Sequence, residues 1–184
     1  IPSFSKQFPD RLDTLTISKI STKSTVVPIG IDIGDLDSID DHPLEKPVIL
    51  WNHRWEYDKN PTDFFRMLEI LEEDRYEFKV ILAGEKYASY PKIFDMYREK
   101  SKERILHFGY AKSRGEYLKL LAMANILPVT SNQDFFGISA VEAIASGVYP
   151  LLPQRLAFPE HLMGRSEFYY SSFSELVSMM KNIM

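Results

Sequence analysis

Two carboxylates, Asp134 and Glu142, stand eight residues apart in the stretch NQDFFGISAVEA. Gly137 lies between them, where we expect a loop to turn into a helix. A helix start exposes backbone N–H groups and a partial positive charge, which suit a phosphate. The acids cannot bind phosphate, but carboxylates accept hydrogen bonds from hydroxyls. The pattern therefore fits a nucleotide diphosphate sugar, and it equally fits a solvated helix acid and an ordinary loop acid.

A second candidate group is basic and consists of Arg54 and Lys59 in a loop after an apolar run. A diphosphate needs cations as well as backbone donors, and an Arg with a Lys meets that need. The alternative is that both side chains pair with Glu56 and Asp58 at the surface. His53 adjoins Arg54, so we expect it in the same cleft.

Other kinds of chemistry find little support in the sequence. There is no cysteine, so disulfides and thiol catalysis are excluded, and no histidine pair has metal-ligand spacing. Neither GxGxxG nor GxxxxGK[ST] occurs, which disfavours an ordinary dinucleotide fold and a P-loop. The net charge of -4 argues against a broad electrostatic grip on nucleic acid. No run of about 18 apolar residues is present, so we expect no membrane-spanning segment.

The elements that must position these residues alternate regularly from Pro47 onward. Strands are expected at residues 48–51, 78–83, 104–108, 125–129, 148–152 and 168–170. Helices are expected from 61, after Pro91, and at 113–124, 138–146 and 174–184. This order predicts an α/β fold, a Rossmann-like parallel sheet of about six strands with helices on both faces.

The candidate residues share one position in this pattern. Arg54, Gly84, Gly109 and Asp134 each follow one of the first four predicted strands. Parallel sheets bind ligands at the carboxyl ends of their strands. We therefore expect these residues to meet at one edge of the sheet.

The residues before Pro47 have a different character. Residues 1–24 are polar and are predicted to be irregular, and residues 25–32 are predicted to form a strand. The chain begins with Ile1, so we interpret residues 1–46 as an interdomain or linker segment from a truncated upstream domain. Residues 47–184 then form the nucleotide-sugar-binding domain.

Together the motifs resemble the C-terminal half of the retaining glycosyltransferases with two Rossmann-like domains, the GT-B fold. The resemblance rests on Arg54, Lys59, Asp134-Phe135-Phe136-Gly137 and Glu142-Ala143. It implies that Arg54 and Lys59 are catalytic and neutralise the diphosphate of the leaving group. It also implies that Asp134 holds sugar hydroxyls and Glu142 the ribose. The remaining donor-binding residues that it implies are Phe136, Gly137, Ile138, Gly84, Phe108, Gly109, Tyr110 and His53.

A narrower resemblance is to the tRNA-queuosine mannosyltransferases. It rests on His53-Arg54-Trp55-Glu56, Asp58-Lys59, Phe135-Phe136-Gly137, Gly147-Val148-Tyr149-Pro150-Leu151 and Pro159-Glu160. It implies GDP-mannose as the donor and queuosine in a tRNA as the acceptor. The chain departs from the pattern at Asp134, where the family usually has Glu.

The resemblance implies further expectations about partners and place. The partners would be a nucleotide sugar, the protein's own N-terminal domain and, through the full-length protein, a tRNA in the cytoplasm. No cofactor and no metal would be required, and the isolated segment would be inactive without its N-terminal domain. Two alternatives remain open: a nucleotide-sugar epimerase of the same architecture, and a degenerate module that only binds nucleotide or another protein.

Overall fold

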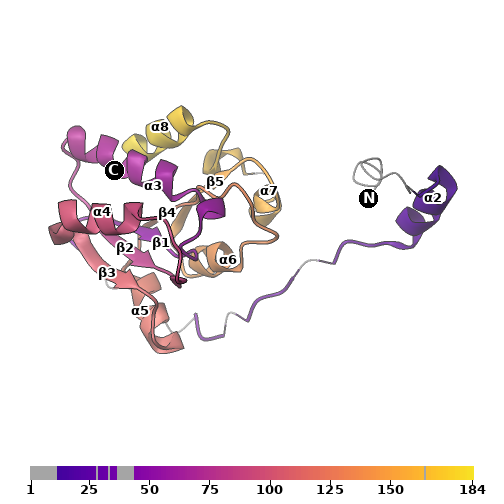
Figure 1. Cartoon of the computed structure of the whole chain (residues 1–184), viewed down its shortest axis with the longest axis horizontal. Coiled ribbons are helices and arrows are strands. Elements are labelled where there is room, and N and C mark those ends of the chain that lie inside the picture. Colours follow the sequence, from indigo (N-terminus) through magenta and orange to yellow (C-terminus); the bar gives the residue numbers. More distant parts are fainter. Residues whose placement is uncertain (1–11, 28, 33, 37–43, 164) are drawn as a thin grey trace. The chain divides into compact units, whose positions relative to one another are not determined.

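The computed structural model describes residues 12–27, 29–32, 34–36, 44–163 and 165–184 (Figure 1). The chain divides into two compact units, Ile1–Gly30 and Ile31–Met184, and each is described by itself. No helix in the described ranges is both long and apolar enough to cross a membrane.

The described part of the first unit contains one helix, α2 (Thr14–Lys23). The prediction that residues 1–24 are irregular is therefore wrong for this stretch. Asp13 caps the helix because its Oδ1 accepts a hydrogen bond from the Thr16 N–H at 2.9 Å. The strand predicted at residues 25–32 is also not found: its described residues lie outside any strand, and Val26 and Val27 are exposed. A strand needs a pairing neighbour, and none of the described strands pairs with this segment.

The second unit contains the predicted parallel sheet, with the strand order β3-β2-β1-β4-β5-β6. The strands are β1 (Val48–Trp51), β2 (Lys79–Ala83), β3 (Ile105–Gly109), β4 (Ile126–Pro128), β5 (Tyr149–Pro153) and β6 (Tyr169–Tyr170). Every strand pairs in parallel with its neighbours, for example Val48 opposite Lys79. The strand order reverses between β1 and β4, which is where such sheets open a ligand crevice.

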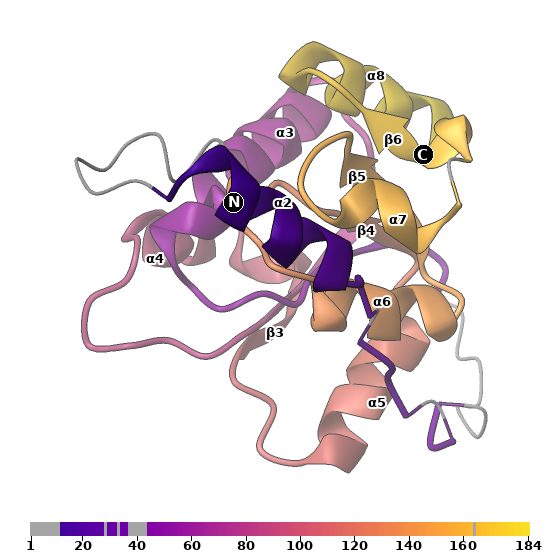
Figure 2. The same ribbon diagram turned by 90° about the vertical axis from the view of Figure 1, so that its right-hand side faces the viewer.

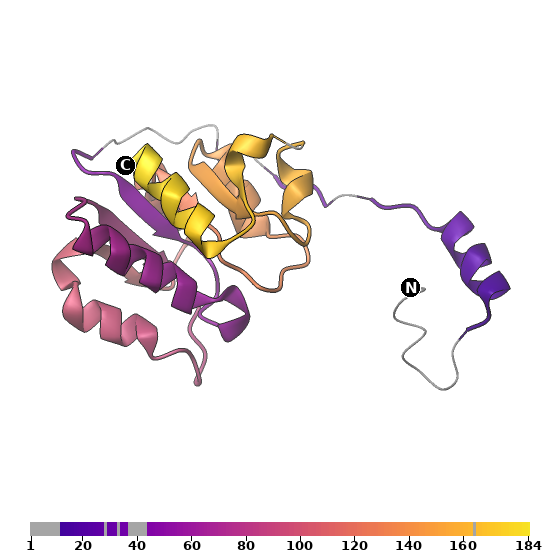
Figure 3. The same ribbon diagram turned by 90° about the horizontal axis from the view of Figure 1, so that it is seen from above.

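Helices cover both faces of the sheet, as predicted (Figures 2 and 3). They are α3 (Pro61–Glu73), α4 (Ile93–Lys100), α5 (Arg114–Met123), α6 (Ile138–Ala145), α7 (Phe158–His161) and α8 (Phe173–Ile183), with single 3-10 turns η1 (Tyr57–Lys59), η2 (Lys102–Arg104) and η3 (Ser166–Phe168). The buried side chains of α3, α4 and α8 join one core, and those of α5, α6 and α7 join the other.

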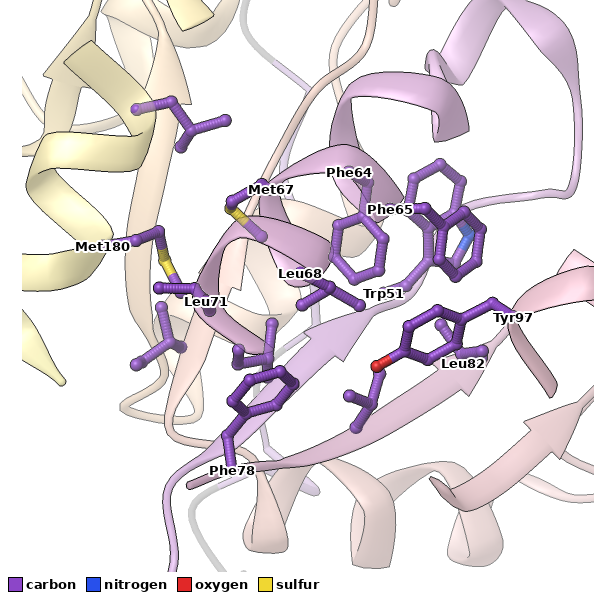
Figure 4. Close-up of a cluster of buried hydrophobic side chains, with 14 of the residues drawn as sticks. Trp51, Phe64, Phe65, Met67, Leu68, Leu71, Phe78, Leu82, Tyr97 and Met180 are labelled. Atoms are coloured by element: carbon purple, nitrogen blue, oxygen red, sulfur yellow. The ribbon is translucent and has the colours of Figure 1, made fainter. Parts of the chain in front are cut away.

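Strand β1 feeds both cores because successive side chains point to opposite faces of a strand. Ile49 and Trp51 enter the core under α3, whereas Val48 and Leu50 enter the core over α5 and α6. The first core is rich in aromatic rings (Figure 4). Burying rings of this size gives this face a large share of the hydrophobic stabilisation.

The loop after β1 is held by this aromatic core. Trp55 is fully buried and stacks on Phe94 with a centroid distance of 4.2 Å. Gly84, after β2, allows the loop to lie close, because a Cβ at Gly84 would come within 2.1 Å of the His53 carbonyl oxygen. This close approach fixes the backbone of the predicted site residues beside the end of β2.

Candidate functional site

A cavity of about 570 Å³ opens at the carboxyl ends of β1 and β2. It is lined by Asn52, His53, Arg54, Ala83, Gly84, Glu85, Tyr110, Ala111, Lys112, Ser113, Arg114, Tyr117, Ser139 and Glu142. Five of the residues predicted from the sequence therefore meet here: His53, Arg54, Gly84, Tyr110 and Glu142. They come from four different loops and helices, as expected for a site at a strand-order reversal.

Of the two predicted cationic side chains, Arg54 is more accessible than Lys59. Its side chain is about half exposed, and its guanidinium makes an ion pair of 3.1 Å with Glu56. The pKa of Arg54 is raised, first by a hydrogen bond with Tyr87 and also by the nearby charge of Glu56. Arg54 thus lines the cavity and also makes the surface pair that the sequence left open as an alternative.

Asn52 and His53 are buried beside Arg54 and both contact Ser139 in the first turn of α6. The Asn52 amide donates to the Ser139 carbonyl at 2.7 Å and to the Tyr117 hydroxyl at 3.2 Å. Nδ1 of His53 lies 3.3 Å from the Ser139 hydroxyl. Burial lowers the pKa of His53 to about 4, so the imidazole is neutral near pH 7.

Glu142 lies in the cavity wall with its carboxylate already paired. Nη1 of Arg114 lies 2.6 Å from the Glu142 carboxylate, and the same guanidinium binds Asp35 through two hydrogen bonds of 2.7 and 3.1 Å. The pKa of Arg114 is raised, chiefly by Asp35 and then by Glu142. Burial, with the charge of Glu142, raises the pKa of the neighbouring Tyr117. A hydroxyl that binds Glu142 must therefore share this carboxylate with Arg114.

Lys59 and Asp134 meet each other directly, behind the loop that precedes α6. The Lys59 ammonium is buried and lies 3.0 Å from Asp134, 3.2 Å from Asp58 and 2.8 Å from the Gln133 carbonyl oxygen. The other carboxylate oxygen of Asp134 accepts the Phe136 N–H at 3.3 Å. Neither side chain belongs to the cavity lining. In this structure the pair holds the loop against η1.

The start of α6 has the form that the sequence predicted. Gly137 is the N-cap residue and has a φ of 82°, a conformation that favours glycine. A Cβ there would also come within 3.0 Å of the Phe158 ring. The Phe136 carbonyl oxygen is 2.6 Å from Nε2 of His161. Phe136, Gly137 and the half-exposed Ile138 shape the helix start but do not line the cavity.

Phe108 and Gly109 line a second cavity of about 460 Å³. Its wall consists of Trp55, Glu85, Lys86, Arg98, Phe108, Gly109 and Tyr110. Glu85 and Tyr110 line both cavities, so the two spaces adjoin. The guanidinium of Arg98 lies over the Phe108 ring at 4.6 Å, which covers this side of the second cavity with a cation.

Seven polar residues of the first cavity were not among the predicted site residues: Asn52, Glu85, Lys112, Ser113, Arg114, Tyr117 and Ser139. Asn52 carried a usable signal, because it directly follows a predicted buried strand. Ser139 carried another, because it lies in the first turn of the predicted helix. Arg114 and Tyr117 gave no local signal, since helix α5 looks like any other covering helix.

One protein family matches most of this chain. The family described as "Glycosyl transferases group 1" matches residues 33–162. A tRNA-queuosine alpha-mannosyltransferase from Drosophila melanogaster is 39% identical over 112 residues, which are 61% of this chain and 29% of the fly protein. The chain therefore aligns with less than a third of that relative's length.

Solved structures share the fold at low sequence identity. A glycosyltransferase from Rickettsia africae superposes with a TM-score of 0.62 and 17% identity, over 95% of this chain and 42% of that chain. The C-terminal domain of a glycosyl transferase group 1 family protein from Francisella tularensis gives a TM-score of 0.62 and 16% identity, over 77% of this chain and 76% of that chain. These likenesses agree with the predicted α/β architecture.

Proposed function

This chain belongs to the group 1 glycosyl transferases, and on that premise we propose that it is the donor-binding part of an enzyme that transfers a hexose from a nucleotide diphosphate sugar. The observation that carries the proposal is the cavity of about 570 Å³ at the strand-order reversal. Its wall combines the Arg54 guanidinium with the Glu142 carboxylate and the first turn of α6.

We assign different parts of the donor to different groups of the site. Arg54 meets the diphosphate and stabilises the negative charge that develops as the nucleotide departs. Outside the cavity lining, the N–H groups at Gly137 and Ile138 add neutral donors at the start of α6 for the part of the donor that extends beyond the cavity. Glu142 accepts a hydrogen bond from the ribose. No cofactor and no metal are assigned a part, so we expect donor binding to persist in the presence of EDTA.

Lys59 and Asp134 have a modified role in this proposal. The Lys59 ammonium already pairs with two carboxylates. One oxygen of Asp134 binds Lys59, and the other accepts a hydrogen bond from the Phe136 N–H. We therefore assign this pair first to holding the loop before α6. Lys59 reaches the diphosphate and Asp134 a sugar hydroxyl only when a bound donor draws them away from each other.

The finer proposal concerns the donor, the acceptor and the stereochemistry. We propose GDP-mannose as the donor, queuosine in a tRNA as the acceptor, and transfer with retention of configuration. The support is the 39% identity with the fly tRNA-queuosine alpha-mannosyltransferase. A tRNA acceptor would place the reaction in the cytoplasm, with acceptor contacts from an N-terminal domain.

Calorimetric titration with GDP-mannose, GDP, UDP-glucose and UDP tests the proposal. We expect the two guanine compounds to bind and the two uridine compounds to bind at least tenfold more weakly. Selective binding of the uridine compounds would support a glycosyltransferase but contradict GDP-mannose as the donor and queuosine as the acceptor. A protein that binds none of the four would contradict the donor-binding role.

A further inference from the structure

Two buried polar atoms in the wall of the first cavity have no partner among the described residues: Oδ1 of Asn52 and Nε2 of His53. Asn52 is 8% exposed and His53 is 4% exposed. Leaving a buried polar atom unpaired costs free energy, so such atoms deserve an explanation. Both residues line the cavity, which makes a ligand the natural partner.

The orientation of the Asn52 amide follows from its neighbours. Its nitrogen donates to the Ser139 carbonyl at 2.7 Å, and a carbonyl can only accept. The second N–H of the same nitrogen serves the Tyr117 hydroxyl at 3.2 Å. Both amide donors are therefore used, and the oxygen is left as a pure acceptor.

A pure acceptor selects the chemistry of its partner. Phosphate oxygens also accept hydrogen bonds, so the diphosphate cannot satisfy Oδ1 of Asn52. A hydroxyl donates and accepts, so it satisfies Oδ1 of Asn52 and either tautomer of His53. Nδ1 of His53 is turned to the Ser139 hydroxyl, which directs Nε2 away from that contact.

We propose that Asn52 and His53 form a hydroxyl-recognition edge that reads the sugar hydroxyls of the bound nucleotide sugar, an inference that rests on the proposed donor-binding function. Ser139 anchors both residues, so the edge is tied to the first turn of α6. Tyr117 connects Asn52 to the side of the cavity that holds Glu142. Hydrogen bonds therefore connect this edge, in the loop after β1, to α5 and α6.

The chain offers a matched pair of variants at His53. The amide of His53→Gln reaches the position of Nε2, whereas the amide of His53→Asn reaches only the position of Nδ1. His53→Asn keeps the contact with Ser139 and removes the edge, and His53→Gln keeps a polar group at the edge. Asn52→Leu removes the amide at similar volume, and its thermal unfolding reports the structural cost separately.

The test is calorimetric titration of the protein and these variants with GDP-mannose and with analogues that each lack one hydroxyl, on the mannose or on the ribose. We expect one deletion to weaken binding to the unsubstituted protein by roughly three- to tenfold. The same deletion should have no further effect in His53→Asn or Asn52→Leu, and His53→Gln should retain the discrimination. The hydroxyl whose deletion weakens binding only in the unsubstituted protein and in His53→Gln is the one that the edge binds. Its position shows whether the edge binds the mannose or the ribose.

Equal discrimination among the analogues by the unsubstituted protein and the folded His53→Asn and Asn52→Leu variants would overturn the hydroxyl edge while leaving the donor site intact. Failure of the unsubstituted protein to bind GDP-mannose would overturn the GDP-mannose donor and this inference with it. The two failures are distinguishable because the first requires normal binding of GDP-mannose.

Discussion

The loops that follow β1 and β4 lie at the same reversal of strand order, but they differ in the partners of their polar groups. After β4, Asp134 and the Gln133 carbonyl oxygen are bound by the buried Lys59 ammonium. After β1, Asn52 and His53 keep buried atoms without a protein partner, and Arg54 extends into the cavity. After β4 the acid is thus used by the fold, although Ser131 Oγ there is also buried without a partner among the described residues. After β1 the unpaired atoms belong to two residues that line a cavity, where a ligand can bind.

The largest effect should come from Lys59, the residue of the loop after β1 that binds the loop after β4. Lys59→Met leaves Asp58 and Asp134 close together without their cation, so we expect a loss of about 3–5 kcal/mol in the free energy of unfolding. Urea unfolding monitored by circular dichroism measures it. The matched control is Lys100→Met, because Lys100 makes a single exposed pair with Glu69 and should cost less than about 1 kcal/mol. Equal losses in the two variants would mean that the buried Lys59 pair contributes no more to stability than an exposed pair.

The second prediction uses the buried imidazole of His53. The pKa of His53 is lowered to about 4 from an ordinary value of 6.5 because burial disfavours the charged form; Lys59 lowers it further, while Asp134 and Asp58 oppose the shift. The unfolded chain therefore binds the proton first as the pH falls. The stability that the neutral imidazole supplies is complete above pH 6.5 and is lost between pH 6.5 and 4, by about 3 kcal/mol.

The measurement is urea unfolding across this pH range for the protein and His53→Asn. Carboxylates elsewhere also titrate, so the informative quantity is the difference between the two curves. We expect the variant to lose less stability on acidification. Parallel curves would show that His53 does not have a lowered pKa in the folded protein.

Third, Arg54→Ala should separate binding from stability. Charged hydrogen bonds contribute roughly 1.5–3 kcal/mol, so nucleotide sugar affinity should fall by an order of magnitude or more. The free energy of unfolding should change by less than about 0.5 kcal/mol because the side chain is exposed. Calorimetric titration and urea unfolding give the two values. An unchanged affinity would contradict the role of Arg54 at the diphosphate.

The smallest predicted effect is a gain. Glu56 holds the Arg54 guanidinium in an exposed ion pair, and such pairs contribute roughly 0.2–1 kcal/mol. Glu56→Gln should release Arg54 and strengthen nucleotide sugar binding about twofold. The same titration measures this gain, and a weaker affinity would mean that Glu56 helps to orient Arg54 toward the ligand.

Local signals in the sequence predicted most of the fold. Asn60 and Ser113 are of residue types that favour helix N-caps, and each accepts a hydrogen bond from the N–H three residues on. Gly137 was expected where a loop turns into a helix, and it is the N-cap of α6 with a positive φ. These features depend on a few adjacent residues, so the sequence carries them openly.

Long-range pairing limited what could be predicted of the site. Lys59 and Asp134 were both chosen for a ligand, but 75 residues of chain separate them and their ion pair has no local signature. The Glu142 carboxylate likewise binds Arg114. The two side chains lie close together only because α5 and α6 pack on the same face of the sheet. Five of the predicted residues line the first cavity, but their hydrogen-bond partners could not be predicted from local sequence.

The arrangement of Arg114 has a consequence for every affinity measured on this protein. One guanidinium binds Asp35 and Glu142 together, so it competes from within the molecule for the carboxylate expected to hold the ribose. A ribose hydroxyl that binds Glu142 must share the carboxylate with Arg114, so the ion pair weakens the acceptor that the nucleotide meets. The affinity of the site therefore depends partly on Asp35, 107 positions earlier in the chain than Glu142, because Asp35 shares the Arg114 guanidinium with Glu142.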